Sequence, residues 1–174
     1  MIRKTRQAKK HSKSAILINN LHPSYKLPIT HNNVRELVSK VMYGEDCHFN
    51  EIIVNFVDNR AIKRLNKKHL NHDYFTDIIT FPYNDKSAKN IEGELFISLN
   101  TVKENGKIYE SGYKMELSRV IIHGSLHLAG YLDRSMMQKE LIREKENYYL
   151  SKFKPKKFKP SKIRFSKTDS EKLK

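Results

Sequence analysis

The apolar residues of this chain recur with two periods, which predict helices and strands in alternation. After Thr30, which with Asn32 is a candidate N-cap, apolar positions follow the i, i+3, i+4, i+7 spacing of an amphipathic helix: Val34, Leu37, Val38 and Val41. Runs rich in β-branched and aromatic residues predict four strands, at 15–19, 51–57, 75–83 and 93–99. A polar loop is expected at 84–90.

Capping residues mark four further helices. They are expected after Asp58, from Asn100, from about Met115, and from a capping box formed by Ser135 and Gln138. Helices packed on a small mixed β-sheet indicate an α+β fold in one domain.

The net charge of +15 is concentrated at the two ends of the chain. Residues 1–13 hold six Lys and Arg and no acid, and residues 151–174 hold ten with two acids. The remaining residues, 14–150, hold eighteen basic and seventeen acidic side chains. We therefore expect a folded domain at 14–150 between a basic disordered arm, 1–13, and a basic tail rich in Lys, Phe and Pro, 151–174.

The tail contains the sequence KFKP twice, and its Lys or Arg residues flank isolated Phe residues. Cations can bind phosphate and aromatic rings can stack on bases, which predicts contact with RNA. The candidates are Lys152, Phe153, Lys154, Lys157, Phe158, Lys159, Arg164 and Phe165. The alternative is a solvated extension with no partner.

Cysteine usage and hydropathy indicate a cytoplasmic protein. Cys47 is the single cysteine, so no intramolecular disulfide can form. No apolar run approaches the roughly 18 residues of a membrane helix. The short run after the basic N-terminus does not suffice for a signal peptide, although a transit peptide remains an alternative.

Residues 115–133, MELSRVIIHGSLHLAGYLD, have the spacing of a metal site. His123 and His127 stand four apart on the expected helix, so their imidazoles share one face. Gly130 can end the helix in a left-handed turn, and Asp133 can then return to the same point. Three protein ligands leave a fourth tetrahedral position for water. The alternative is a pair of ordinary helix histidines.

The same segment can be compared with the zinc peptidase pattern HExxHxxGxxH. Gly124 replaces the glutamate that acts there as general base, and Asp133 replaces the third histidine. The pattern HxxxHxxxxxD is therefore zincin-like in its ligands but disfavours a metallopeptidase.

These residues resemble a known family, the YbeY-type rRNA maturation factors, which are metal-dependent endoribonucleases of bacteria. HGSLHLAGYLD is similar to the family signature HGxLHLxGYDH, residues 65–82 (LNKKHLNHDYFTDIITFP) to its TDVLSFP block, and GELFIS at 93–98 to its acidic strand motif. Two of the differences from these motifs concern the chemistry of the site. Asp133 falls on the third histidine, and Leu70 falls on an arginine that usually precedes the TD motif.

The resemblance implies a single-strand-specific endoribonuclease that matures the 3′ end of 16S rRNA and acts in quality control of the small ribosomal subunit. Its partners would be rRNA and that subunit. The donor set favours one Zn²⁺ per chain, held by His123, His127 and Asp133. Leu70 favours an alternative, a non-catalytic ribosome-assembly or RNA-binding factor with a structural metal. A metallopeptidase is the third and least favoured class.

No catalytic acid or base is assigned, but two helper residues are candidates. Arg119 lies one helical turn before His123 and could neutralise phosphate charge in place of the missing arginine. Asp77 of the TD motif could accept a hydrogen bond from a metal ligand or cap a turn. A zinc ion with one carboxylate ligand keeps a net charge near +1, so its bound water is a weaker acid than at a three-histidine site.

Overall fold

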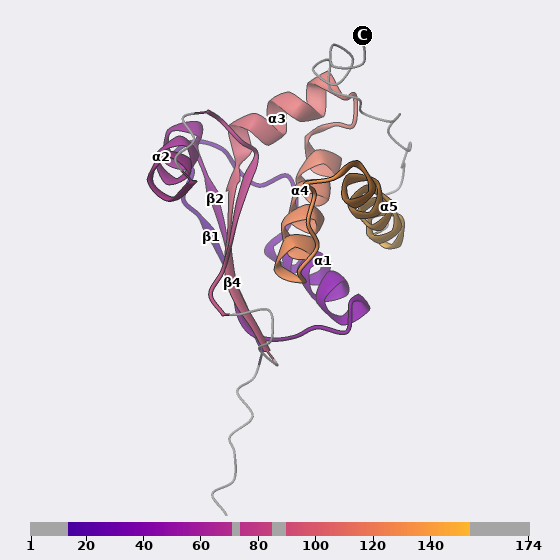
Figure 1. The fold of residues 1–174 in the computed structure, drawn as a ribbon. Coiled ribbons are helices and arrows are strands. Elements are labelled where there is room, and N and C mark those ends of the chain that lie inside the picture. Colours follow the sequence, from indigo (N-terminus) through magenta and orange to yellow (C-terminus); the bar gives the residue numbers. More distant parts are fainter. Residues whose placement is uncertain (1–13, 71–73, 85–89, 154–174) are drawn as a thin grey trace, which may run out of the picture.

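The computed structural model describes residues 14–70, 74–84 and 90–153, and its centre is a four-stranded sheet (Figure 1). The strands are β1 (Ala15–Asn20), β2 (His48–Val57), β3 (Ile78–Pro82) and β4 (Asn90–Ser98), in the order β1-β2-β4-β3. β1, β2 and β4 run parallel, and β3 pairs antiparallel with β4. The predicted α+β fold with a small mixed sheet is confirmed.

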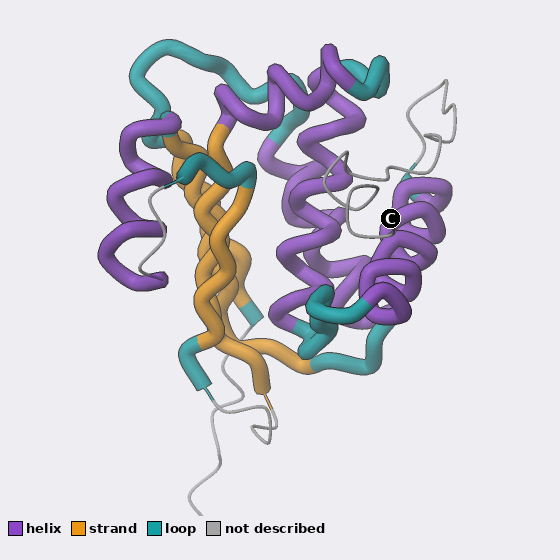
Figure 2. The backbone as a smooth tube through the Cα atoms, turned by 45° about the horizontal axis from the view of Figure 1, so that its top comes forward, coloured by secondary structure: helices purple, strands orange, loops and turns teal. Residues whose placement is uncertain are grey.

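Helices cover both faces of the sheet. In the described ranges they are α1 (His31–Gly44), α2 (Asn59–Leu70), α3 (Leu99–Ile108), α4 (Tyr113–Leu128) and α5 (Met136–Lys152). Figures 1 and 2 show α1, α4 and α5 on one side of the sheet and α2 on the other. None of these helices has the length and hydropathy needed to cross a bilayer.

Local side-chain hydrogen bonds begin α1, α2 and α5 where the sequence predicts, whereas Ser98 and not Asn100 caps α3, and α4 begins at Tyr113 without a side-chain cap. Thr30 caps α1 in a capping box with Asn33, and Ser135 caps α5 in the predicted box with Gln138. The carboxylate of Asp58 accepts the backbone N–H three residues further on at 2.7 Å, which caps α2.

The strands differ from the prediction at their ends. β2 begins at His48 and β4 at Asn90, each three residues earlier than expected, because these two strands pair along their whole length. β3 begins only at Ile78. The Thr76 hydroxyl donates to the Ile78 carbonyl at 3.2 Å, and this local bond holds the preceding residues in a turn.

The folded domain extends past residue 150, which corrects the predicted role of Phe153. This residue, expected in the RNA-binding tail, is only 5% exposed and belongs to the hydrophobic core. It follows the buried side of α5, which carries Ile142, Tyr149 and Leu150. Lys152 is the last residue of α5, and its ammonium lies over the Tyr148 ring. The predicted arm, 1–13, and the candidates from Lys154 to Phe165 lie outside the described residues.

Gly124 lets α4 lie close against the sheet. A Cβ at this position would stand 2.3 Å from Cδ1 of Ile78 and 3.0 Å from Cδ2 of Leu95. Leu95 is fully buried, so it has little room to move. The residue that replaces the peptidase glutamate therefore fills a packing position and has no access to a reacting group.

We expect Gly124→Val to lower the free energy of unfolding by about 1–3 kcal/mol, because the added methyl groups overpack the contact between α4 and the sheet. Urea denaturation followed by circular dichroism measures this. Lys114→Val, at an exposed position of the same helix, should change stability far less. Equal stabilities of the two variants would contradict the packing role of Gly124.

Candidate metal centre

Two imidazoles project from neighbouring turns of α4 and meet at their Nε2 atoms. Nε2 of His123 lies 2.9 Å from Nε2 of His127, and the ring planes are 87° apart. The four-residue spacing places both rings on one face of the helix, as predicted. Both side chains are half-buried, because the neighbouring Ile121, Ile122 and Leu126 pack into the core.

The far nitrogen of each ring makes a hydrogen bond. Nδ1 of His127 donates to the Tyr131 carbonyl at 2.9 Å, since a carbonyl oxygen can only accept. Nδ1 of His123 donates to Oε1 of Glu146 at 2.8 Å. With both Nδ1 atoms protonated, each neutral ring presents an Nε2 lone pair, and the two lone pairs point at one another. A cation or a proton between them removes their repulsion.

A left-handed turn after α4 brings the third predicted ligand to the imidazoles. Gly130 has φ +97°, and the N–H of Tyr131 donates back to the Leu126 carbonyl at 3.0 Å. The chain therefore reverses, and single donor atoms of His123, His127 and Asp133 all lie within 4.8 Å of one another.

The three side chains could hold a metal ion. Two imidazole nitrogens and one carboxylate oxygen are donor types that zinc accepts, and such a set leaves room for a fourth ligand. A neutral imidazole with its lone pair on Nε2 is the form that binds a metal ion, so the two facing Nε2 atoms fit a bound cation.

Glu146 sets the charge of the site. Burial disfavours the charged form of His123, yet the bond to Glu146 holds the pKa of His123 above its ordinary value. Burial and the adjacent His123 lower the pKa of His127. Despite its burial, the bonds from His123 and Arg119 keep the pKa of Glu146 below its usual value. Glu146 is therefore an anion and His127 a neutral donor at neutral pH.

Arg119 supports Glu146 from the other side. Its Nη1 lies 2.9 Å from Oε2 of Glu146 and 3.0 Å from Oδ1 of Asn147, and the side chain is 11% exposed. Arg119 and His123 both donate to Glu146, each to a different carboxylate oxygen. Arg119 therefore positions the carboxylate that orients His123, a candidate metal ligand, while the phosphate contact expected from its spacing stays a prediction.

Sequence reasoning missed Glu146, although one signal was present. Glu146 lies four residues after Ile142 and four before Leu150, on the buried side of α5, and is 8% exposed. An acid in the apolar stripe of an amphipathic helix needs a buried partner. That position marks it as a candidate for a functional or structural ion pair.

Asp77, the predicted acceptor for a metal ligand, lies in the same pocket without taking that role in the described contacts. Its carboxylate accepts from the Thr76 hydroxyl at 3.4 Å, and its backbone carbonyl accepts from the N–H of Ser98 at 2.8 Å. Its charge contributes to the raised pKa of His123. Glu146 makes the hydrogen bond that the sequence assigned to Asp77 as one of two alternatives.

A second carboxylate, Glu45, anchors the turn that carries the ligands. It follows α1 and accepts hydrogen bonds from the hydroxyls of Tyr131 and Tyr149 at 2.5 Å and from Lys145 at 2.8–2.9 Å. Tyr131 lies in the turn that follows α4 and also supplies the carbonyl that orients His127. Glu45 therefore connects this turn to the end of α1 and to α5. Glu45 was also absent from the predicted site.

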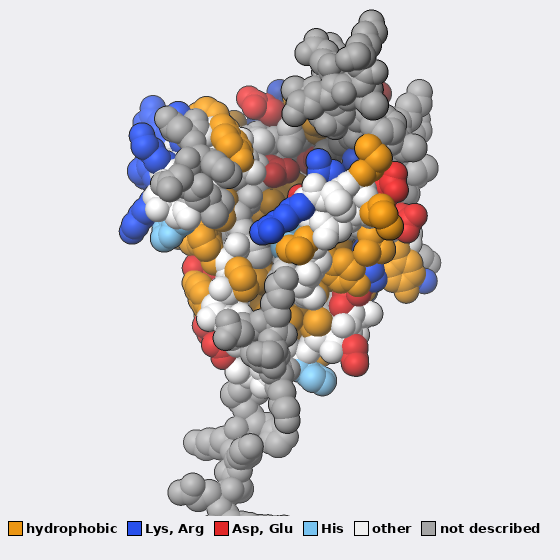
Figure 3. Space-filling view, in the orientation of Figure 1, with side chains coloured by type: hydrophobic (Ala, Val, Ile, Leu, Met, Phe, Trp, Pro, Cys, Tyr) orange, Lys and Arg blue, Asp and Glu red, His pale blue; other side chains and the backbone are white. Residues whose placement is uncertain are grey.

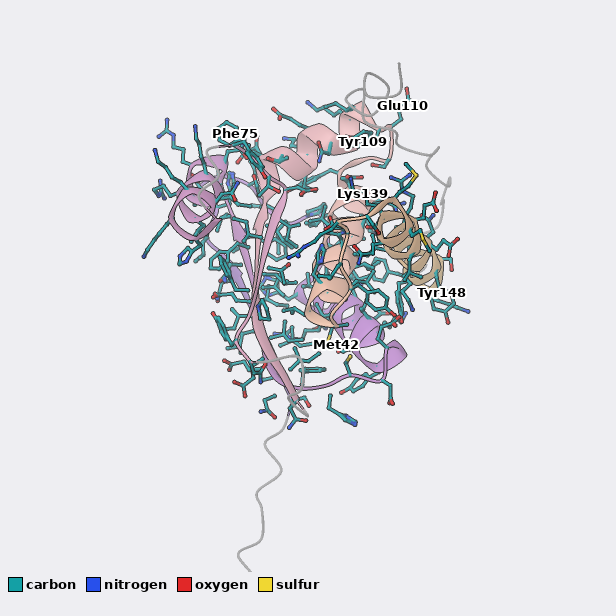
Figure 4. All side chains as sticks on the ribbon, viewed as in Figure 1. Met42, Phe75, Tyr109, Glu110, Lys139 and Tyr148 are labelled. Atoms are coloured by element: carbon teal, nitrogen blue, oxygen red, sulfur yellow. The ribbon has the colours of Figure 1, made fainter. Side chains whose placement is uncertain are left out.

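A cavity of about 220 Å³ opens beside His123 and Asp133. Lys139 and Arg143, one turn apart on α5, line it together with Arg119. Figure 4 shows Lys139 extending from α5 across this region towards the sheet. Three cations thus face a cavity that is also lined by two of the candidate metal ligands, His123 and Asp133, and by the carboxylates of Asp77, Glu116 and Glu146.

The chain matches the family model described as Endoribonuclease YbeY over residues 18–154. It belongs to the YbeY family. The Endoribonuclease YbeY of Chloroherpeton thalassium is 42% identical over 126 residues, covering 72% of this chain and 88% of that protein. That of Chlorobium phaeobacteroides strain BS1 is 37% identical over 131 residues, covering 75% and 94%.

A solved structure agrees with the fold. The solution structure of a protein from Thermotoga maritima superimposes with a TM-score of 0.58 at 28% identity, covering 80% of this chain and 89% of that one. Membership of the YbeY family supports an endoribonuclease role for the chain, with RNA as the substrate class.

We expect Glu146→Gln to weaken zinc binding about 10- to 100-fold, because it removes the anion that orients His123 and raises its basicity. Isothermal titration calorimetry with zinc measures the affinity. Glu144→Gln, at an exposed position of the same helix, is the matched control. Equal affinities of the two variants would show that Glu146 has no influence on the ligand set.

The Glu45 cluster predicts a pH dependence of stability. Although burial opposes it, hydrogen bonds from Lys145, Tyr131 and Tyr149 lower the pKa of Glu45 from its usual 4.5. The resulting stability is present above pH 4.5 and is lost as the pH falls through the lower folded value. Glu45→Gln should reduce the unfolding free energy by about 1–2 kcal/mol at pH 7 and much less at pH 3.

Denaturant unfolding at a series of pH values tests this expectation. Glu36→Gln serves as the control, because Glu36 pairs with Lys40 at an exposed position of α1. A Glu45→Gln effect of the same size at pH 3 and pH 7 would argue against an ionised, hydrogen-bonded Glu45.

Proposed function

We propose that this chain is a zinc-dependent, single-strand-specific endoribonuclease of the cytoplasm. In this proposal it matures the 3′ end of 16S rRNA and takes part in quality control of the small ribosomal subunit. The observation that carries the proposal is the convergence of His123, His127 and Asp133 within 4.8 Å. It is supported by membership of the YbeY family, whose named relatives are endoribonucleases.

The donor set assigns one Zn²⁺ to each chain, held by Nε2 of both imidazoles and by the Asp133 carboxylate. When bound, the ion supplies Lewis acidity and lowers the pKa of a coordinated water. The protein contributes orientation. Glu146 and the Tyr131 carbonyl hold the two rings in one tautomer, and Arg119 and Glu45 hold those acceptors in place.

Cationic side chains of the cavity would bind the phosphate of the strand to be cut. Lys139 and Arg143 line the cavity from α5. They provide the positive charge that the family arginine, replaced by Leu70 in this chain, would otherwise contribute. Because Lys139 and Arg143 can supply this charge, the change at Leu70 does not exclude catalysis, and we favour a catalytic metal over a structural one.

Leu70 also keeps the second candidate, a ribosome-assembly factor with a structural metal, in the comparison. A metallopeptidase is disfavoured further by the packing of Gly124 against Ile78, which leaves no place for a glutamate base. The two remaining candidates differ in one observable property, which is cleavage of bound RNA.

We expect the purified protein to cut single-stranded regions of an rRNA 3′-end fragment, with loss of cutting in EDTA and recovery on adding zinc. His123→Ala should abolish the activity, because it removes a ligand. Lys139→Ala should lower kcat/KM about tenfold or more, since one cation no longer faces the phosphate. Denaturing gel electrophoresis of labelled RNA measures all three, with Lys107→Ala as a control cation outside the cavity.

Tight RNA binding by the zinc-loaded protein without any cleavage would support the assembly factor instead. Turnover of peptides with none of RNA would support the peptidase and overturn the proposal.

A further inference from the structure

We propose that the outer surface of α2 is a binding site for the phosphate backbone of the RNA strand outside the cavity. We call this surface the α2 cationic stripe, formed by Arg60, Arg64 and Lys68. The inference rests on the proposed function, because it assigns to the same substrate a second place of contact. It concerns affinity for a long strand and leaves the chemical step to the metal centre.

The charge of α2 is unbalanced in a way that the net charge of the domain conceals. The helix, NRAIKRLNKKHL, carries five Lys and Arg and no acid. Each of the other four helices in the described residues carries both signs. Without α2, residues 14–150 contain thirteen basic and seventeen acidic side chains, so the rest of the domain is acidic. The near-neutral domain is therefore electrically polarised.

Packing directs these charges into solvent. Ile62 and Asn66 are buried under α2, and Ile62 forms a cluster with Val57 and Ile79 of the sheet. The members of the α2 cationic stripe stand four residues apart and are all exposed. Residues at this spacing follow one face of a helix, about 6 Å apart along its axis. Figure 3 shows Lys and Arg side chains gathered over α2.

The stripe and the cavity lie near one another along the chain. Seven residues after α2 ends, Asp77 lines the cavity beside His123. Phe75 lies between them, is 55% exposed, and has the Lys63 ammonium 5.3 Å from its ring centroid. In Figure 4 Phe75 lies beside α2. An exposed aromatic ring next to cations is a platform on which a base can stack.

The size of the cavity explains why a second contact is needed. About 220 Å³ is less than the roughly 300–1,000 Å³ of pockets that enclose a drug-sized ligand, so most of a polynucleotide must lie outside it. A row of cations matches the regular negative charge of a phosphate backbone. The exposed Phe75 ring, on which a base can stack, favours RNA over an acidic protein as the occupant.

The test compares two triple variants of the full-length, zinc-loaded protein. The first is Arg60→Gln, Arg64→Gln and Lys68→Gln, which removes the stripe and keeps good helix formers. The second is Lys26→Gln, Lys107→Gln and Lys114→Gln, which removes the same charge from exposed positions elsewhere. Binding of a fluorescein-labelled 20-nucleotide oligouridylate is measured by anisotropy at several salt concentrations. Gels check that the RNA stays intact.

We expect the stripe variant to bind at least tenfold more weakly than the control variant at 100 mM salt. Its slope of log K against log salt should be shallower by about two, since each lost contact with a single strand contributes about 0.7. Cleavage of a four-nucleotide RNA should be the same in both variants, because the proposed stripe contacts only the part of a strand that lies outside the cavity.

Equal binding by the two variants would overturn the proposal and leave α2 to an acidic protein. Loss of short-strand cleavage in the stripe variant would also overturn the proposal, because the α2 cationic stripe would then affect the chemical step and not only the affinity for a long strand. The proposed function fails separately, if the unmodified protein binds RNA but cuts neither strand. Circular dichroism confirms that both variants are folded.

Discussion

The metal centre depends on the hydrogen bonds at the far nitrogens of its two imidazoles. The acceptors, Glu146 and the Tyr131 carbonyl, force both rings into the tautomer whose Nε2 lone pair faces inwards. The two nitrogens then stand 2.9 Å apart. A shared proton or a bound cation relieves the repulsion between their lone pairs. Orientation is thus built into the fold before any ligand binds, which reduces the entropy that binding must overcome.

The acceptors are themselves held by charges from distant parts of the chain. Arg119 of α4 contacts Glu146 of α5, and Glu45, which follows α1, contacts Tyr131 in the turn after α4. Each carboxylate is low in exposure and fully paired with donors, as buried charges require. Three helices are therefore joined through polar contacts that converge on the ligands. The hydrophobic core sets where α4 lies, and these contacts set how its histidines point.

The sequence predicted what depends on neighbouring residues. The ligands His123, His127 and Asp133 lie within eleven residues, and the Ser135 capping box within four, so spacing alone could find them. Glu146 and Glu45 act across the fold, at separations of 23 and 86 residues from His123 and Tyr131. Composition was misleading at Phe153, because a basic surrounding sequence concealed a core residue. It was also misleading at α2, where an even balance of charge over the domain hid a local excess.

The ligand triad occupies one continuous segment, α4 and the turn that follows it, whereas the cations around the cavity come mainly from α5. Residues of α5 that are not buried can be substituted without moving a candidate ligand. The two properties can therefore diverge separately during evolution, so that relatives with the same metal chemistry can differ in the sequence or shape of the nucleic acid that they accept. In the proposed function, cations of α5 take the place of the arginine that Leu70 replaces, so the charge for phosphate and the candidate ligands belong to separable parts of the architecture.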